Sequence, residues 1–507
     1  NEGFSLGQQT PVLLRADQTA AAPHPLRYMG TVLPPTLDPT KTDEGELISD
    51  LFSGLVRLSE DADLVPDVAA SWQIADGGLT YIFHLRDDVQ WSDGQPVTAG
   101  DFVYAWRRAL DPEDGAPAAT ILYDIKGARQ AEASWDPEKV GVSAPDAFTL
   151  RVELEQPASY FLQVLAHGVA APVPRHVVES YGETWADSDQ VVTNGPFRLE
   201  SFQQGEALTL RRNPTYHGPF QGNLEFVELQ HHPDFEKAMR LYADDEIDIL
   251  STWSFSADEF QWITQQYADD YFNLITNLTG FLGFNVNRPP FDDARVRRAF
   301  VLATDLHFLA DHHELGRAFP ATGGFVPPGM PGHVPDIALP YDLAAARRLL
   351  AEAGYPDGRG LPPLTALLHP GDRVRLPEFT FKPWESTLGV KVSWQIVPWR
   401  EYRERIRVEQ PHLYGFGWDS TYRDPDGYLR TGMLHISEWR DPAYFELVER
   451  ARGLLDHQER MRLYRQAEEI LRDQAPIMPA LYLRSNMLIK PWVRNYPLRD
   501  ISYWHWF

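Results

Sequence analysis

Residues 80–110 decide the fold class, reading T-Y-I-F-H-L-R at 80–86, W-S-D-G at 91–94 and D-F-V-Y-A-W-R-R-A-L at 101–110. The first run is rich in β-branched and aromatic residues between a glycine pair and an aspartate pair, which predicts a strand. Asp93-Gly94 predicts a turn, because glycine tolerates a positive φ. Thr98 stands three residues before Asp101, as in a capping box, and the apolar residues that follow have helical spacing. A strand, a turn and a helix in succession predict an α/β or α+β fold.

The same alternation continues along the chain. Helical spacing, with aspartate caps and glycine stops, predicts further helices, and alternation of apolar and polar residues predicts further strands. The predicted helices are 343–353, 399–409 and 460–473, and the predicted strands are 247–250, 390–396 and 480–483.

Composition excludes several classes of protein. The chain has 507 residues, which suggests two to four domains. Its net charge of −26 disfavours binding to nucleic acid or to anionic lipid. It has no cysteine, so disulfides, thiolate metal sites and cysteine nucleophiles are excluded. With 15 Trp and 21 Tyr it is rich in the flat side chains that line ligand clefts.

Motifs of one known family occur in order from about residue 28 to residue 493. They are L-D-P at 37–39, L-F-S-G-L at 51–55, P-D-V-A-A-S-W at 66–72, F-H-L-R at 83–86, W-S-D-G at 91–94, D-F-V-Y-A-W at 101–106, T-N-G-P-F at 193–197, N-P-T-Y at 213–216, N-V-N at 285–287, P-F at 290–291, L-L-A-E-A-G-Y at 349–355 and G-W at 417–418. On these motifs the chain resembles the peptide- and nickel-type solute-binding proteins of ABC importers, family 5 of the extracellular solute-binding proteins. Within that group it is most similar to the oligopeptide-binding type.

This resemblance implies a periplasmic-binding-protein type of α/β fold, with two lobes that close about a hinge and an extra inserted domain. Carried over by motif order, domain I is 1–54, 173–279 and 484–507, domain II is 55–172, and domain III is 280–483. The hinge is expected near Thr279-Gly280 and Leu483-Arg484. The implied function is capture of a peptide or peptide-like solute and its delivery to membrane permease subunits, by a periplasmic monomer without a cofactor.

The segment from Tyr414 to Leu429 reads Y-G-F-G-W-D-S-T-Y-R-D-P-D-G-Y-L, which mixes aromatic, polar and turn-forming residues. Loops that carry so many aromatic and polar side chains usually line a binding site. The resemblance places this loop beside the ligand cleft. Arginines near it are able to meet a ligand carboxylate in a forked pair. The predicted ligand-binding residues are Trp418, Asp419, Thr421, Tyr422, Asp424, Trp399, Arg405, Arg423, Trp253, Phe281, Tyr123 and Phe416.

The chain departs from the oligopeptide-binding pattern at two places. Similar proteins have an aspartate three positions after the tryptophan, where it holds the ligand's α-ammonium, and this chain has Thr421. Either Asp419 or Asp424 takes over that role, or the ligand has no free ammonium there. The stretch 40–49, which pairs with the ligand backbone in the family, is also shorter. An opine, a sugar conjugate or a modified peptide therefore stays open as the ligand.

The sequence bears on three other functions: nickel binding, catalysis and periplasmic sensing. A nickel complex is an alternative ligand on this scaffold, and His231-His232 and Asp311-His312-His313-Glu314 draw attention. Adjacent helical side chains diverge by about 100°, which disfavours chelation by neighbours. Motifs of hydrolases, phosphate-binding loops and dinucleotide-binding folds are absent from the sequence, so we do not expect an enzyme. A periplasmic sensor needs the same closing lobes as an importer component, and the sequence does not separate the two.

Overall fold

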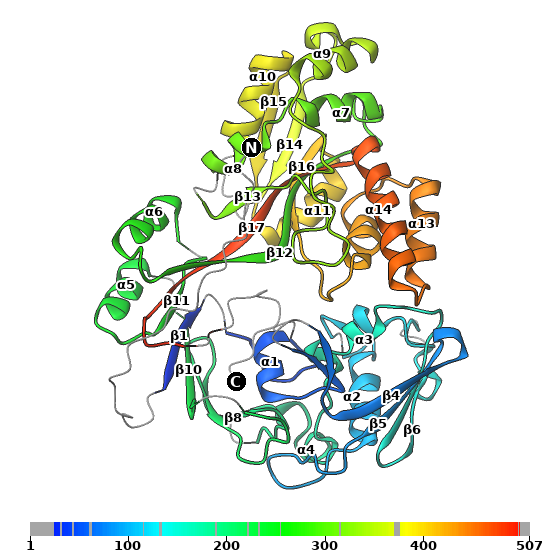
Figure 1. The fold of residues 1–507 in the computed structure, drawn as a ribbon, viewed down its shortest axis with the longest axis vertical. Helices are drawn as coiled ribbons and strands as arrows, with labels where there is room; N and C mark the ends of the chain where they lie inside the picture. Colours follow the sequence, from blue (N-terminus) through cyan, green and yellow to red (C-terminus); the bar gives the residue numbers. More distant parts are fainter. Residues whose placement is uncertain are drawn as a thin grey trace.

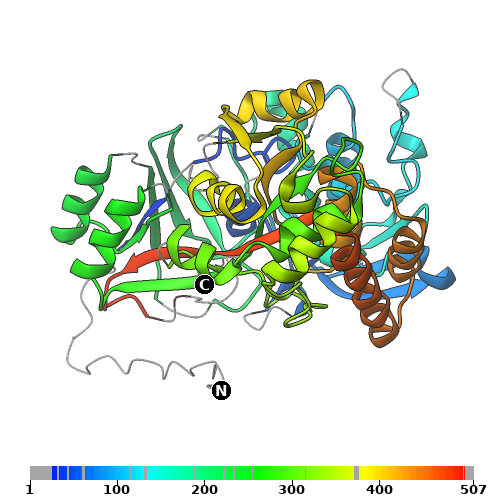
Figure 2. The ribbon, with the colours of Figure 1, turned by 90° about the horizontal axis from the view of Figure 1, so that it is seen from above.

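The computed structural model describes residues 25–30, 33–42, 45–59, 63–114, 116–130, 134–187, 190–220, 223–231, 234–253, 255–313, 316–369, 376–494 and 496. The ribbon forms two lobes (Figure 1). Lobe 1 contains β1 to β11 and α1 to α6, and lobe 2 contains β13 to β16 and α7 to α14. Strands β12 and β17 run through both lobes, side by side in both views (Figures 1 and 2).

The strands and helices have the following bounds. The strands are β1 Leu26–Gly30, β2 Val56–Leu58, β3 Leu64–Pro66, β4 Ala69–Ala75, β5 Thr80–Leu85, β6 Val142–Asp146, β7 Thr149–Glu153, β8 Phe197–Gln203, β9 Ala207–Arg212, β10 Phe226–His231, β11 Ile249–Ser251, β12 Tyr271–Phe284, β13 Ala318–Pro320, β14 Leu364–Leu368, β15 Val392–Ile396, β16 Leu413–Trp418 and β17 Ile477–Ile489. The helices are α1 Gly45–Leu51, α2 Ala99–Ala109, α3 Phe161–Val164, α4 Arg175–Tyr181, α5 Phe235–Ala243, α6 Ala257–Gln266, α7 Ala294–Leu302, α8 Leu306–His313, α9 Leu343–Glu352, α10 Lys382–Leu388, α11 Trp399–Glu409, α12 Met433–Ile436, α13 Pro442–Arg452 and α14 His457–Gln474.

The elements from β2 to α3 form a body at one side of lobe 1, here called the inserted domain (Figure 1). Its sheet has the order β4-β5-β7-β6, with antiparallel neighbours. Helix α2 packs on β6 and β7 and buries Phe102, Ala105 and Trp106 on one face. The Trp106 indole donates a hydrogen bond of 2.9 Å to the Ala170 carbonyl. This body shares one continuous apolar core with the neighbouring part of lobe 1.

Strands β12 and β17 connect the lobes through an irregular stretch. Ile275 pairs with Arg484, but Thr279 pairs with Tyr482, so three residues of β12 stand opposite one residue of β17. A bulge of this kind bends a strand and loosens its ladder. It lies beside the predicted hinge at Thr279-Gly280 and Leu483-Arg484. The predicted domain boundaries stay a prediction, with this bulge as the feature that favours them.

Lobe 2 is built on the order β15-β14-β16-β12-β17. Strand β14 pairs in parallel with β15 and with β16, and β12 is antiparallel to β16. One apolar core of lobe 2 contains Phe284, Phe300 and Trp384, and a second contains Phe325, Tyr428 and Tyr464. Because β14, β15 and β16 run in one direction, their carboxyl ends meet at one edge of the sheet.

Candidate functional site

The carboxyl ends of β14, β15 and β16 form the edge of lobe 2 that carries several predicted ligand-binding residues. His369 follows β14, Trp399 begins α11 after the two residues that connect it to β15, and Asp419 follows β16. In open α/β sheets, ligands bind outside the carboxyl ends of parallel strands. The segment that continues from β16 contacts the inserted domain, since the rings of Tyr422 and Tyr160 stack with centroids 4.7 Å apart. This edge therefore faces lobe 1.

Trp399 presents an aromatic surface at this edge. Half of its surface is exposed, at 50%, and its ring lies 5.2 Å from that of Phe416 and 5.1 Å from that of His369. Tyr402 is buried behind it, with a ring centroid 5.9 Å away and a hydroxyl that donates to the Leu367 carbonyl over 3.0 Å. An exposed tryptophan held in place by packed rings suits contact with an apolar or flat ligand group.

Asp419 supplies a carboxylate at the same edge, directly after β16. Its side chain is exposed, and within the described part of the chain it has no ion-pair partner. Desolvation by the surrounding protein nevertheless raises its pKa. Carboxylates whose pKa is shifted by desolvation are candidates for function. The neighbouring Trp418 is half-buried and donates from its indole nitrogen to the Gly427 carbonyl over 2.9 Å.

Residues 63–434 match the family model described as bacterial extracellular solute-binding proteins, family 5 Middle. The chain belongs to this family. The predicted family, the two-lobe α/β fold class and the function as the solute-binding component of an importer are thereby confirmed. Family 5 consists of solute-binding proteins rather than enzymes.

The relatives of this chain are named after different ligands. The probable deoxycholate-binding periplasmic protein YgiS of Escherichia coli is 34% identical over 495 residues, covering 94% of this chain and 91% of YgiS. The periplasmic oligopeptide-binding protein OppA of Escherichia coli is 30% identical, covering 92% of this chain and 88% of OppA. The murein tripeptide-binding protein MppA, in an unliganded open form, superposes with a TM-score of 0.82 at 29% identity, covering 95% of this chain and 96% of MppA.

Within the 414–429 segment, Asp419 and Thr421 are exposed, whereas the other predicted polar residues make contacts inside the protein. Tyr422 is buried and donates to Asp426 Oδ2 over 2.7 Å. Asp424 is buried and pairs with Arg460 at 2.7 Å, and burial raises its pKa to about 6. Arg423 donates to the Gly329 carbonyl over 2.7 Å.

The other predicted residues lie in different surroundings. Phe281 is buried beneath Phe416, with ring centroids 5.9 Å apart. Arg405, on α11, donates to Glu409 over 2.5 Å and to Gln395 over 2.6 Å. Trp253 follows β11 in lobe 1 with 39% of its surface exposed, and Tyr123 lies in the inserted domain with the Arg129 guanidinium 5.5 Å from its ring. These contacts do not join the four residues into one site.

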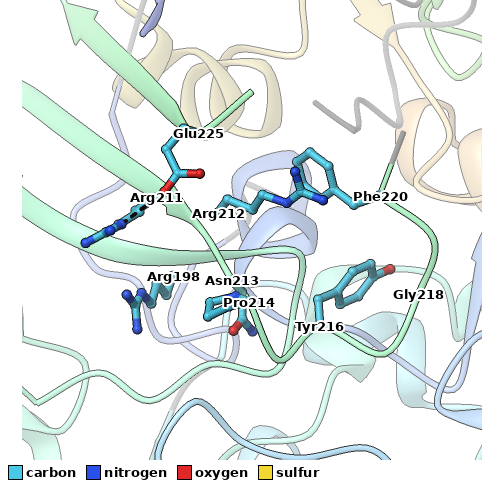
Figure 3. A pocket seen from close by; sticks show the side chains of 9 residues that line it. All are labelled: Arg198, Arg211, Arg212, Asn213, Pro214, Tyr216, Gly218, Phe220 and Glu225. Atoms are coloured by element: carbon cyan, nitrogen blue, oxygen red, sulfur yellow. Dashed lines mark hydrogen bonds and ion pairs between the residues drawn. The ribbon is translucent and has the colours of Figure 1, made fainter. Parts of the chain in front are cut away.

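Sequence reasoning missed a cationic recess in lobe 1 of about 490 Å³. Figure 3 shows Arg211 beside Glu225, at 3.4 Å, and Arg212 directed toward Phe220, with its guanidinium 4.0 Å from the ring centroid. Arg198 and Arg211 stand directly opposite each other on β8 and β9. The lining residues are Arg198, Arg211, Arg212, Asn213, Pro214, Tyr216, Gly218, Phe220 and Glu225. All belong to lobe 1, so this recess is not part of a site shared by both lobes.

Two further findings concern metals and membranes. Among the described residues, no group of three His, Cys, Asp or Glu side chains is arranged to hold a metal ion. His232, Glu314 and the side chain of His313 lie outside the described residues. Within the ranges that the structure describes, every helix is too short or too polar to span a membrane.

Proposed function

We propose that the protein captures a short peptide or peptide-like solute between its lobes, leaves it chemically unchanged, and delivers it to the permease subunits of an ABC importer. The relatives named for peptides support this ligand class, since one is an oligopeptide-binding protein and another a murein tripeptide-binding protein. Because the named curated relatives are periplasmic, we extend that compartment to this protein. We expect it to act there as a monomer.

The observation that carries the proposal is that two exposed residues, Asp419 and Trp399, both lie at the edge of lobe 2 formed by the carboxyl ends of its parallel strands. An exposed carboxylate without an ion-pair partner in the described chain is suited to an α-ammonium group, because hydrogen bonds to charged groups are strong. The Trp399 and Phe416 rings are suited to apolar side chains. A peptide held this way extends along the strand ends, where main-chain hydrogen bonds accept varied sequences.

The proposed site consists of Trp399, Phe416, Trp418, Asp419 and Thr421 in lobe 2. We place Asp419 in the role that the family gives to the aspartate replaced here by Thr421. Asp424 is left out because it is buried and paired with Arg460. Closure on lobe 1 then requires ligand contacts to both lobes, since only differential contacts shift such an equilibrium.

A non-peptide amphipathic acid is the second candidate ligand. Thr421 favours it, because the residue at this position carries no charge for an ammonium group. One relative, at 34% identity, is named as a probable deoxycholate-binding protein, which supports this ligand class. An exposed tryptophan surface suits a rigid apolar ring system as well as a peptide side chain.

Two measurements decide between these ligands. Mass spectrometry of the denatured protein identifies what co-purifies, and we expect a mixture of short peptides. Calorimetric titration with trialanine, N-acetyl-trialanine and deoxycholate tests the same point in solution. We expect trialanine to bind, and acetylation to weaken binding by about 10- to 150-fold, because one hydrogen bond to a charge is lost. Binding of deoxycholate without binding of either peptide would refute the peptide proposal.

A further inference from the structure

The two lobes meet at a second place besides the β12–β17 connection. There Tyr422 of lobe 2 packs on Tyr160 of the inserted domain, with ring planes 16° apart. Tyr422 is only 5% exposed and belongs to the same buried apolar cluster as Tyr160. In Figure 1, α13 and α14 of lobe 2 lie above α3 of the inserted domain. A lobe 2 side chain is therefore part of the core of the inserted domain.

Buried polar groups surround the two stacked rings. The Tyr160 hydroxyl donates to Asp124 Oδ2 over 2.6 Å and accepts from Arg430 Nη2 over 2.7 Å. Burial and the nearby carboxylates of Asp426 and Asp124 raise the pKa of Tyr160, so its hydroxyl keeps the proton that it donates. Arg452 of lobe 2 also donates to Asp124 and binds Gln156 over 3.1 Å. We call Asp124, Tyr160, Tyr422, Arg430 and Arg452 the clasp.

The clasp holds lobe 2 and the inserted domain in one relative position, so that the two surfaces do not slide past each other. Asp124 and Arg452 are 9% and 11% exposed at the side chain, and breaking a buried pair leaves an uncompensated charge. Backbone groups also join across the interface, because the Ser159 amide donates to the Arg452 carbonyl over 2.9 Å. Arg460 adds a bond of 2.6 Å to Ser159 Oγ. Directional bonds at several points fix both the distance and the register of the two bodies.

The same segment of lobe 2 carries the clasp and the proposed ligand site. Asp426 is fully buried and accepts from Tyr422 and from Arg430, at 2.7 Å and 2.6 Å. Only two residues separate Asp419 from Tyr422. At the other side, the Asn277 amide donates to the Ser420 carbonyl over 3.0 Å, and Asn277 lies in the β12 bulge. Residues 419–422 are thus held between the bulge of the connecting strand and the inserted domain.

We infer that the clasp positions Asp419 for its ligand, so that the inserted domain tunes ligand affinity without touching the ligand. Tyr160 and Asp124 are positioning residues, which act through Tyr422, Arg430 and Arg452 on the segment that carries Asp419. The role of Asp419 rests on the proposed function, whereas the hold of the clasp on the segment does not.

Hydrogen exchange of the ligand-free protein tests the clasp without any ligand. Tyr160→Phe removes one hydroxyl and keeps the stacked ring, and Asp124→Asn keeps the shape of the carboxylate. We expect either change, made in the inserted domain, to speed exchange of lobe 2 amides 422–430 by about 10-fold or more. Tyr181→Phe is the matched control, since Tyr181 is 51% exposed on α4. Unchanged exchange at 422–430 in both clasp variants, or equal acceleration in the control, would overturn the inference.

A double-mutant cycle tests the link to the ligand, with trialanine as the probe. In the native background we expect Tyr160→Phe to weaken trialanine binding between about 5- and 150-fold, the usual range of coupling between sites. In an Asp419→Asn background we expect the same change to have little further effect, because the positioned group is already gone. Equal losses in both backgrounds would contradict positioning through Asp419. Failure of trialanine to bind at all would count against the proposed ligand, while the exchange experiment still decides the clasp.

Discussion

Glu468 makes the stability of lobe 2 depend on pH. It lies on α14 with 2% of its surface exposed, and its Oε1 accepts from the Phe325 and Val326 amides at 3.1 Å and 3.0 Å. Burial raises its pKa from 4.5 to about 7. The folded chain therefore holds a proton between pH 4.5 and 7 that the unfolded chain has released. The free energy of unfolding must fall as the pH rises through this window and level off above it.

The size of this effect follows from the two pKa values. The difference between about 7 and 4.5 corresponds to about 3 kcal/mol, at about 1.36 kcal/mol for each pKa unit. Glu468→Gln cannot ionise and keeps an oxygen able to accept both amides. We expect the variant to equal the native protein near pH 4.5 and to be more stable by up to about 3 kcal/mol at pH 8.

Urea unfolding followed by tryptophan fluorescence, at intervals from pH 4.5 to pH 8, measures this difference. Other titrating groups, Asp424 among them, are present in both proteins and cancel in the comparison. Glu469→Gln, at the next and partly exposed position, is the control and should show no growing difference. If the gap between native protein and Glu468→Gln does not widen from pH 4.5 to 8, the reasoning about this buried carboxylate is wrong.

Three further predictions concern the proposed ligand site. Asp419→Asn should weaken binding of free-amino peptides by about 10- to 150-fold in calorimetry and should leave N-acetyl peptides unaffected; an equal loss for both would show that the ammonium is held elsewhere. Thr421→Asp should strengthen free-amino peptide binding, and no gain would place the ammonium away from this position. Trp399→Ala should lower ligand affinity by about 10-fold while urea unfolding changes little, because the side chain is half exposed; a large loss of stability instead would make it a core residue.

Local signals in the sequence predicted several elements closely. Helix α11 has the predicted bounds, because Pro398 precedes it and the apolar spacing is clear. Asp342 caps α9 by accepting from the Ala345 amide over 2.9 Å, and Gly354 beyond its end has a φ of +96°. Helix α2 begins at Ala99, and the capping box predicted for Thr98 and Asp101 is present: the Thr98 amide and hydroxyl donate to Asp101 at 2.8 Å and 2.9 Å.

The bounds of strands that depend on pairing with distant parts of the chain were predicted poorly. Strand β17 runs from 477 to 489 rather than from 480 to 483. Pro479 lies within this strand and stands opposite Phe281, where the ladder shifts register. A missing amide is tolerated at such irregular positions. The neighbours of β17, including β11 and β12, come from distant parts of the chain, and local patterns carry no information about them.

The candidate site shows why composition predicts a functional segment better than it predicts functional residues. A loop dense in aspartate, tyrosine and arginine is costly unless its polar groups have partners, and those partners are either a ligand or one another. In 414–429 most are one another: Tyr422 pairs with Asp426, Asp424 with Arg460, and Arg423 with a backbone carbonyl. Asp419 is the carboxylate of this segment that stays accessible. Polar residues that bind a ligand and polar residues that pair with one another are of the same types. Contacts with Arg460 and Tyr160 tell the two cases apart, and these residues come from distant parts of the sequence.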